Sequence, residues 1–267
     1  MSYSYQPKIA RDGLVFATDA KNPKSTDYKE DIVTDGLIFY TNSSNPKCTN
    51  SNTSAIDLIS NNTGTLNGGM TVEGTDWTFD GVDEYINFGN TFGNSIGDNY
   101  TGDMTISVWL NTNITNGNDG IFYTGPFNSS QGTISMIIAF DLLFFRVKDA
   151  IGYYDIVTDF TDINNWNQLT IVYKSNDISN SNIYINNTLP TQTKNFTTYG
   201  GEASGWPSSL DFSGFDTIIG GYFNSSYLFD GEISNVKIYN RVLSQEEITQ
   251  NYNAGRLATL PSITNQT

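Results

Sequence analysis

Hydrophobic and polar residues alternate along much of this chain, in short runs that end at Gly, Asn or Asp. Residues 104–110 place Met, Ile, Val and Leu between Thr, Ser and Trp, which is the period of two of a half-buried β-strand. Residues 132–148 predict two strands about a bend near Asp141, and residues 166–173 and 182–186 predict a hairpin. Roughly a dozen short strands at this spacing predict an all-β, two-sheet antiparallel sandwich.

The C-terminal part of the chain has a different pattern. Residues 229–231 (Phe-Asp-Gly) predict a turn, because Asp-Gly accepts a positive φ, and residues 233–239 predict a strand. Ser244 and Glu247 have the spacing of a capping box, and Gly255 is expected to end the short helix that follows. Only this segment carries a convincing helical signal.

A repeat near the N-terminus sets the domain boundaries. Residues 12–25 return as residues 35–48, with eight of 14 aligned positions identical. The second copy is expected to open a single domain, 35–255, with a strand at 36–41, followed by a C-terminal tail, 256–267. The first copy then lies on an extended N-terminal arm, 1–34. Because Leu14, Val15 and Phe16 are apolar, we expect the arm to dock, either on its own domain or on another subunit by strand addition.

The composition and charge of the chain exclude several classes of partner and site. The 267 residues carry a formal net charge of −15, which disfavours nucleic acid and anionic membranes as partners. No apolar run reaches the length of a membrane-spanning helix. The first residues lack the apolar core of a secretion signal, so we expect synthesis in the cytoplasm. The single cysteine, Cys48, excludes an intrachain disulfide.

Catalytic patterns are scarce. Histidine is absent, which excludes Ser/His/Asp triads, Cys/His pairs and His-ligated metals. Sandwich glycosidases need two carboxylates that face one cleft, yet the glutamates show no Glu-x-Asp-x-Glu alternation. The neighbours Asp83 and Glu84 would point to opposite faces of a strand. We therefore predict that the protein is not an enzyme.

Five segments, in order, carry a family resemblance: 77–86 (Trp-Thr-Phe-Asp-Gly-Val-Asp-Glu-Tyr-Ile), 104–109, 166–173, 182–187 and 229–252. In this order they resemble the laminin G-like jelly rolls of the concanavalin A-like lectin superfamily. The resemblance implies a concanavalin A-like jelly roll with one short C-terminal helix, in which Trp109 and Trp166 pack structurally.

Some relatives use calcium near such loops, so the resemblance leaves calcium open as a cofactor. The candidate ligands are Asp80, Asp83 and Asp230, although calcium needs 6–8 oxygen ligands and these aspartates alone do not define such a site. No other cofactor is expected.

Aromatic residues in predicted loops are the candidate glycan-binding residues. Trp206 and Tyr199 lie in a long Gly/Ser/Pro loop, and Phe127 and Tyr227 lie in two others. Exposed Trp and Tyr rings suit a stacking platform or an interface anchor. A third reading, an aromatic lid folded onto its own domain, is equally consistent with the sequence.

The repeated Asp-Gly-Leu-x-Phe and Asn-Pro-Lys segments resemble those of laminin G-like domains in tailed-phage structural proteins. This resemblance implies a virion protein: a capsid decoration, head fibre or tail-associated module. Its arm would bind other virion proteins, its domain would bind host polysaccharide weakly, and it would form a homo-oligomer. The alternative is a bacterial surface lectin module, and a carbohydrate-active enzyme is the third hypothesis.

Overall fold

The computed structural model describes residues 32–49, 53–70, 72–73, 76–97, 100–112, 117–126, 132–148, 152–175, 177–198, 210–222 and 227–258. The chain divides into two units, 1–31 and 32–267, and every described residue belongs to the second. The predicted arm, with Leu14, Val15 and Phe16, lies outside the described residues. The domain's packing begins by Val33, whose N–H donates to Asn251 Oδ1 at 3.0 Å and whose carbonyl accepts from the Tyr239 hydroxyl at 3.0 Å.

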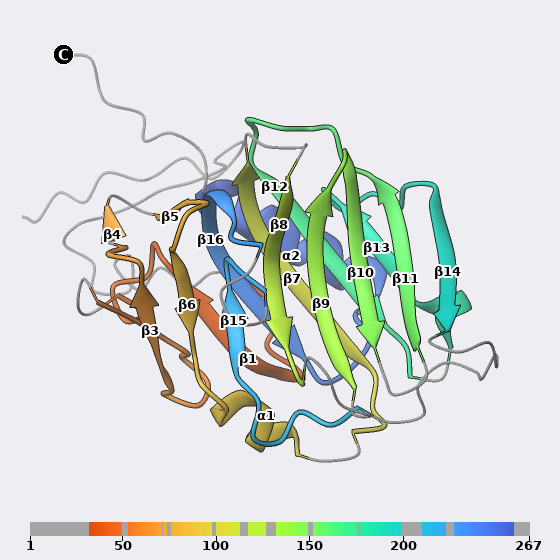
Figure 1. Cartoon of the computed structure of the whole chain (residues 1–267), viewed down its shortest axis with the longest axis horizontal. Helices are drawn as coiled ribbons and strands as arrows, with labels where there is room; N and C mark the ends of the chain where they lie inside the picture. The colour runs from red at the N-terminus through yellow and green to blue at the C-terminus, as the bar shows by residue number, and fades with distance from the viewer. Residues whose placement is uncertain are drawn as a thin grey trace, which may run out of the picture. The chain divides into compact units, whose positions relative to one another are not determined.

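The described strands form two antiparallel sheets that pack face to face (Figure 1). The seven-stranded sheet contains β1 (Leu37–Asn42), β4 (Val72–Glu73), β5 (Asp76–Asp80), β7 (Met104–Thr112), β12 (Asn167–Tyr173), β13 (Asn182–Ile185) and β16 (Asp230–Tyr239). Its order is β13–β12–β7–β16–β5–β4, and β1 pairs with the second half of β16. The predicted sandwich and the predicted hairpin, β12 with β13, are therefore confirmed.

The nine-stranded sheet contains β2 (Ser54–Ile56), β3 (Thr63–Asn67), β6 (Tyr85–Asn87), β8 (Asn118–Thr124), β9 (Thr133–Ala139), β10 (Leu142–Lys148), β11 (Gly152–Asp159), β14 (Gln192–Thr198) and β15 (Thr217–Ile219). Its order is β14–β11–β10–β9–β8–β15–β6–β3–β2. The bend predicted near Asp141 is confirmed: Phe140 and Asp141 have φ of 53° and 61° and connect β9 to β10.

Alternate residues of both sheets build the core between them. The inward side chains of β7 are Met104, Ile106, Val108 and Leu110, which are at most 1% exposed. Phe39 of β1 packs edge-on against Phe88 and Phe92, with ring centroids 5.0 and 5.6 Å apart. The period of two in the sequence thus produces one continuous apolar layer, as expected for a sandwich.

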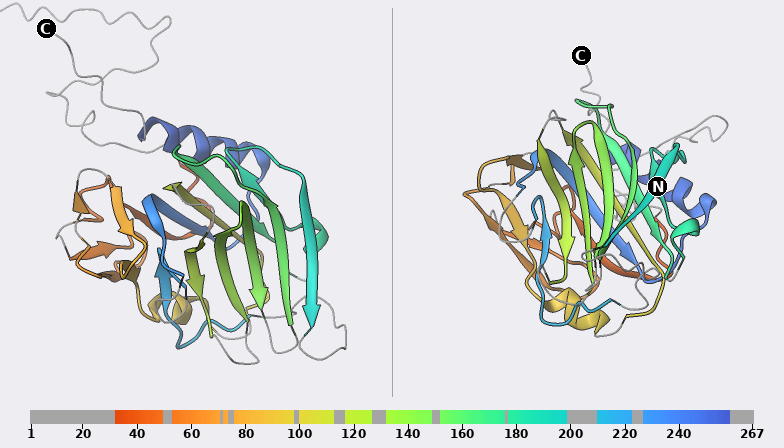
Figure 2. Two further views of the ribbon diagram at one scale, coloured as in Figure 1. Left: turned by 45° about the horizontal axis from the view of Figure 1, so that its top comes forward. Right: turned by 45° about the vertical axis from the view of Figure 1, so that its right-hand side comes forward.

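The C-terminal helix, α2 (Gln245–Ala258), lies on the side of the seven-stranded sheet that faces away from the core (Figure 2). The predicted capping box is confirmed: Ser244 N–H donates to Glu247 Oε2 at 2.9 Å, and Glu247 N–H donates to Ser244 Oγ at 3.3 Å. The prediction that Gly255 ends the helix is wrong. Gly255 lies inside α2, where a Cβ atom would come within 2.1 Å of Trp109 Nε1.

Two further local predictions need correction. Residues 229–231 do not form a turn, because Asp230 and Gly231 already belong to β16 and pair with Asp80 and Phe79 of β5. Gly231 has φ of 147°, and a Cβ there would lie 2.2 Å from the Asn111 carbonyl oxygen, so close packing explains the glycine. A second helix, α1 (Thr91–Ile96), was not predicted from the sequence. Asn90, the residue before it, makes no side-chain cap hydrogen bond.

Two remaining findings concern helices. A single 3₁₀ turn, η1 (Ile178–Asn180), joins β12 to β13. Within the described ranges, no helix is both long and apolar enough to cross a membrane.

Candidate functional site

Aromatic side chains gather on the outer face of the nine-stranded sheet, away from the core. Tyr123 of β8 alternates with the core residue Phe122, and it stands opposite Ser135 of β9 and Ile218 of β15. The apolar residues of this face form a cluster separate from the main core. We call this cluster, with Tyr227 beside it, the aromatic face: Tyr85, Tyr123, Ile137, Ala139, Phe144, Ile218, Tyr222 and Tyr227.

Three tyrosines run in sequence across the aromatic face. The ring of Tyr123 meets Tyr222 edge-on at 4.8 Å, and Tyr222 lies 5.6 Å from Tyr227. Tyr123 is 1% exposed and Tyr222 is 6% exposed, whereas Tyr227 is 48% exposed. Burial and the neighbouring Tyr222 raise the pKa of Tyr123, so its phenol stays neutral. The buried rings therefore support an outer ring, Tyr227, that a ligand can reach.

The backbone of Tyr227 is held by the sheet beneath it. Its carbonyl oxygen accepts a hydrogen bond of 2.7 Å from Gly120 N–H in β8. A Cβ at Gly120 would lie 2.7 Å from that oxygen and 2.6 Å from the Gly221 carbonyl carbon. Only glycine therefore allows the segment before β16 to lie this close to β8.

Charged side chains border the aromatic face on β10 and β11. Arg146 donates from Nε and Nη2 to the two carboxylate oxygens of Asp155, at 2.7 and 2.8 Å. Its guanidinium also lies over the Tyr153 ring, 4.0 Å from the centroid. Burial lowers the pKa of Arg146. The hydrogen bonds and the charge of Asp155 raise the pKa by more, so that the pKa lies above its ordinary value. Lys148 follows two residues later on the same face, and its pKa is lowered by burial and by Arg146.

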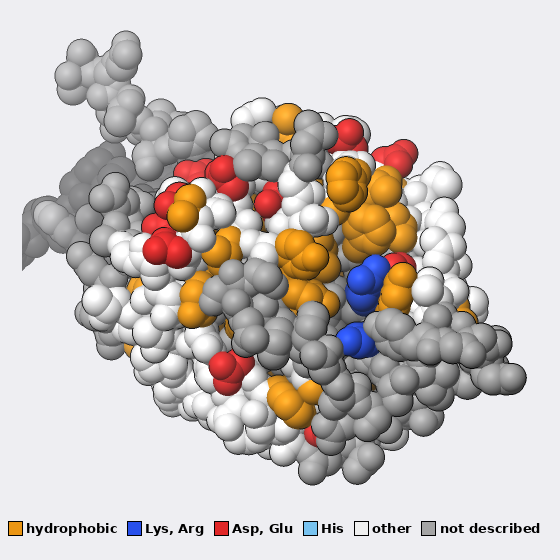
Figure 3. Space-filling view, viewed as in Figure 1, with side chains coloured by type: hydrophobic (Ala, Val, Ile, Leu, Met, Phe, Trp, Pro, Cys, Tyr) orange, Lys and Arg blue, Asp and Glu red, His pale blue; other side chains and the backbone are white. Residues whose placement is uncertain are grey.

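Figure 3 looks directly onto this face. Hydrophobic side chains gather over β9–β11, and the Lys and Arg side chains lie beside them over β10. Acidic side chains lie towards β4 and β5, and others lie at the upper edge of the view, beside the hydrophobic side chains. The face therefore combines aromatic rings with two cationic side chains, Arg146 and Lys148.

Of the four glycan-binding residues predicted from the sequence, Tyr227 lies on the aromatic face. Trp206, Tyr199 and Phe127 lie outside the described residues. The residues that directly follow these segments are Gly132 and Leu210, and they are in contact: a Cβ at Gly132 would lie 2.2 Å from Leu210 Cδ2. Structural packing is confirmed for Trp109, which is 1% exposed and stacks on Tyr252 at 5.5 Å.

Sequence reasoning missed Tyr123, Phe144, Arg146 and Tyr222. One signal was available: in residues 142–148, Leu-Leu-Phe-Phe-Arg-Val-Lys, alternate positions separate Phe144, Arg146 and Lys148 from an apolar set. That separation shows which residues share a face. It does not show that Tyr222, from a distant part of the chain, lies on the same face.

The predicted calcium ligands are only partly brought together. Asp80 of β5 and Asp230 of β16 are cross-strand neighbours, and Asp83 lies in the turn after β5. This turn uses its acids locally: Asp80 Oδ1 accepts from Val82 N–H at 2.8 Å, and Glu84 Oε2 accepts from Asp80 N–H at 2.7 Å. Within the described ranges, no three acidic side chains converge as metal ligands. Calcium binding remains a prediction from the resemblance.

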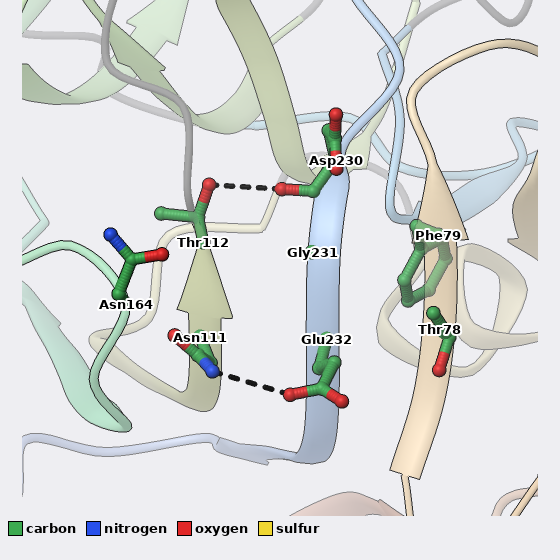
Figure 4. A pocket seen from close by; sticks show the side chains of 8 residues that line it. All are labelled: Thr78, Phe79, Asn111, Thr112, Asn164, Asp230, Gly231 and Glu232. Carbon is green, nitrogen blue, oxygen red and sulfur yellow. Dashed lines mark hydrogen bonds between the residues drawn. The ribbon is translucent and has the colours of Figure 1, made fainter.

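A polar hollow of about 250 Å3 lies at β5, β7 and β16 of the seven-stranded sheet (Figure 4). Asn111 Nδ2 donates to Glu232 Oε2 at 3.2 Å, and Thr112 Oγ1 donates to the Asp230 carbonyl at 2.9 Å. The Asp230 and Glu232 carboxylates point to opposite ends of the hollow. Because they do not face a shared point, this geometry does not favour paired-acid chemistry.

Comparison with known proteins decides the family. A laminin G model, described as the concanavalin A-like lectin/glucanases superfamily, matches residues 80–249, more than half of the chain. The chain belongs to this superfamily. The predicted resemblance to laminin G-like jelly rolls is thereby confirmed. No significant match was found among curated proteins.

Solved structures share the fold. The receptor-binding domain of botulinum neurotoxin D has a TM-score of 0.60 and 17% identity, over 85% of this chain and 54% of that chain. The binding domain of botulinum neurotoxin DC in complex with SialylT has a TM-score of 0.58 and 18% identity, over 82% and 52%. The chain thus spans about half the length of these neurotoxin domains.

Domain 4 of AbnA, a GH43 extracellular arabinanase from Geobacillus stearothermophilus, in complex with arabinotriose, is similar over nearly its whole length. The TM-score is 0.56 and the identity 14%, over 81% of this chain and 98% of that domain. At these identities the similarity establishes the jelly-roll fold alone.

Proposed function

We propose that this protein is a non-catalytic carbohydrate-binding domain that recognises glycans through its aromatic face. The observation that carries the proposal is the placement of three tyrosines on the solvent side of the nine-stranded sheet, ending in the exposed ring of Tyr227. An aromatic ring offers an apolar face to the C–H groups of a sugar, and its hydroxyl offers a polar tip. Nearby polar groups then supply orientation.

The comparisons support the same chemistry. Of the similar structures, the AbnA domain was solved with arabinotriose and the neurotoxin DC binding domain with SialylT. The separated carboxylates of the polar hollow support a binding role over hydrolysis. A turnover assay on any bound polysaccharide tests the non-catalytic part, and turnover that is lost with Glu84→Gln would overturn it.

The binding test is a glycan array probed with the full chain and with Tyr227→Ala. We expect Tyr227→Ala to weaken glycan binding about tenfold, the loss of a single stacking contact. Phe140→Ala is the matched control, since Phe140 is 67% exposed on the same sheet but lies at the β9–β10 bend. Equal losses in both variants, or no bound glycan, would contradict the proposal.

We further propose that the domain is displayed on a bacteriophage particle, as a capsid decoration, head fibre or tail-associated protein. The repeat of residues 12–25 and 35–48 supports this setting. Here the N-terminal arm, with Leu14, Val15 and Phe16, would bind capsid or tail proteins, and the chain would be a homo-oligomer. A bacterial surface lectin is the alternative. Mass spectrometry of purified particles separates the two, because a particle without this chain excludes the virion role.

A further inference from the structure

Two cations are neighbours on the aromatic face of a strongly acidic chain. The protein has 13 Lys and Arg against 28 Asp and Glu. Arg146 and Lys148 nevertheless occupy alternate positions of β10, so that both point outward beside Phe144. Burial and the charge of Arg146 lower the pKa of Lys148, and an anion bound beside the two cations would oppose the second effect.

The guanidinium of Arg146 is fixed in place before any ligand binds. Asp155, 8% exposed, holds Nε and Nη2, and the Tyr153 ring lies 4.0 Å from the guanidinium carbon. The Arg146 side chain is 28% exposed. The described residues give its Nη1 no hydrogen-bond partner. A pre-oriented, partly desolvated donor of this kind suits a carboxylate oxygen.

We infer that the aromatic face binds glycans that carry a carboxylate, with Arg146 and Lys148 receiving the carboxylate while the exposed ring of Tyr227 holds the sugar. The inference rests on the proposed glycan binding and names its substrate class. Asp155 is the residue that positions Arg146. Since Asp155 already holds two donors of Arg146, the site suits a ligand with a single carboxylate. A densely sulfated glycan matches less well, because the rest of the protein repels it.

The experiment uses the full chain on oligosaccharides in matched pairs that differ in a carboxylate, such as sialyllactose with lactose and glucuronate-terminated with glucose-terminated oligosaccharides. Sulfated oligosaccharides form a third arm. The first variant combines Arg146→Gln with Asp155→Asn, so that a neutral pair of amides replaces the ion pair and neither charge is left unpaired. Lys148→Gln is the second variant, and it leaves the Arg146–Asp155 pair intact.

Lys194→Gln is the matched control. Lys194 lies in β14 of the same sheet, but its Nζ donates to Ser179 O at 2.7 Å and to Asn182 Oδ1 at 3.1 Å, next to the other sheet. The control therefore removes one positive charge from the same sheet without touching the aromatic face. Thermal unfolding of each variant establishes that the fold is retained.

We expect the carboxylated member of a pair to bind more tightly. We also expect the affinity for the carboxylated member to fall about tenfold in the double variant and about threefold in Lys148→Gln. The affinity for neutral sugars should change less than twofold in these variants, and Lys194→Gln should change the affinity for either member less than twofold. Equal binding of neutral and carboxylated members, unaffected by the two variants, overturns this inference and leaves the proposed function standing. Tighter binding of sulfated sugars overturns the carboxylate assignment. Binding to no glycan overturns both proposals.

Discussion

The outer faces of the two sheets have opposite characters. On the seven-stranded sheet, α2 stacks Tyr252 on Trp109, and the outward residues nearby are polar yet buried: Gln168 is 1% exposed and Lys237 is 0% exposed. On the nine-stranded sheet, the outward residues are aromatic and apolar, and no described helix covers them. A sheet face that the chain covers with its own helix is structural. The outer face of the nine-stranded sheet is buried at Tyr123 and Tyr222 but exposes the ring of Tyr227, which makes it the better candidate for binding a partner.

The largest expected effect lies at Asp119 of β8, whose carboxyl interacts with the charge of Asp230 in the other sheet. Asp119 is 5% exposed, and its Oδ2 has no hydrogen-bond partner among the described residues. Burial and the charge of Asp230 raise its pKa from 3.8 to about 6. The folded state therefore holds this proton more tightly than the unfolded state, and ionisation costs stability as the pH rises through 6.

We expect Asp119→Asn to raise the free energy of unfolding at pH 8 by up to about 3 kcal/mol, two pKa units at 1.36 each, and by little at pH 4. Urea unfolding at both pH values measures the difference. Asp216→Asn is the control, because this exposed carboxylate accepts its hydrogen bond from Asn87 Nδ2 and an amide oxygen can replace it. A gain that is equal at both pH values would contradict the electrostatic explanation.

The next effect tests the helix-covered face. Gly255→Ala would place a Cβ 2.1 Å from Trp109 Nε1 and 2.6 Å from its Cε2, against an indole held by Tyr252. We expect a loss of about 2 kcal/mol, since overpacking a rigid neighbour outweighs the better helix propensity of alanine. Glycan binding should not change.

Asn253→Ala is the control for this substitution, because Asn253 is exposed on the same helix. It should leave stability unchanged or slightly raised in thermal unfolding. A Gly255→Ala protein as stable as the wild type would show that α2 is not packed tightly on this face, and the contrast between the two faces would weaken.

Much of the fold is predictable from the sequence, because alternation is a local property. Residues 104–110 alternate as a strand must, and the structure places them in β7, inside Met104–Thr112. The Ser244–Glu247 capping box is equally local and also forms. Gly255 shows the limit of such reasoning: glycine usually marks a helix end, but here a tryptophan more than 140 residues away requires it.

The candidate site was less predictable, because its members meet only through strand register. Tyr123 and Tyr222 are about 100 residues apart and come together because β15 pairs with β8. In β10, Phe144 points outward and Phe145 points into the core, and nothing local distinguishes the two faces. Tyr227 was predictable as a loop aromatic, but its role as the outer end of a tyrosine row was not.

A smaller effect compares one buried serine from each outer face. Ser135 of β9 is 0% exposed, and its Oγ has no hydrogen-bond partner among the described residues. Ser107 of β7 is equally buried, but its Oγ accepts from Thr170 Oγ1 at 3.3 Å. We expect Ser135→Ala to stabilise the protein by about 1 kcal/mol and Ser107→Ala to destabilise it by about 1 kcal/mol. The same sign in both, by urea unfolding, would contradict this account.

The smallest effect is expected in the polar hollow, and it is the sharpest test of which face binds. Glu232 accepts from Asn111 Nδ2, and the amide oxygen of Glu232→Gln can accept the same bond. We therefore expect a stability change below about 0.5 kcal/mol and unchanged affinity for every glycan that the wild type binds. Titration of one bound glycan against Glu232→Gln and Tyr227→Ala in parallel measures the contrast. If the Glu232 variant lost binding while the Tyr227 variant kept it, recognition would belong to the seven-stranded sheet, because only a ligand in that hollow would respond to the lost charge.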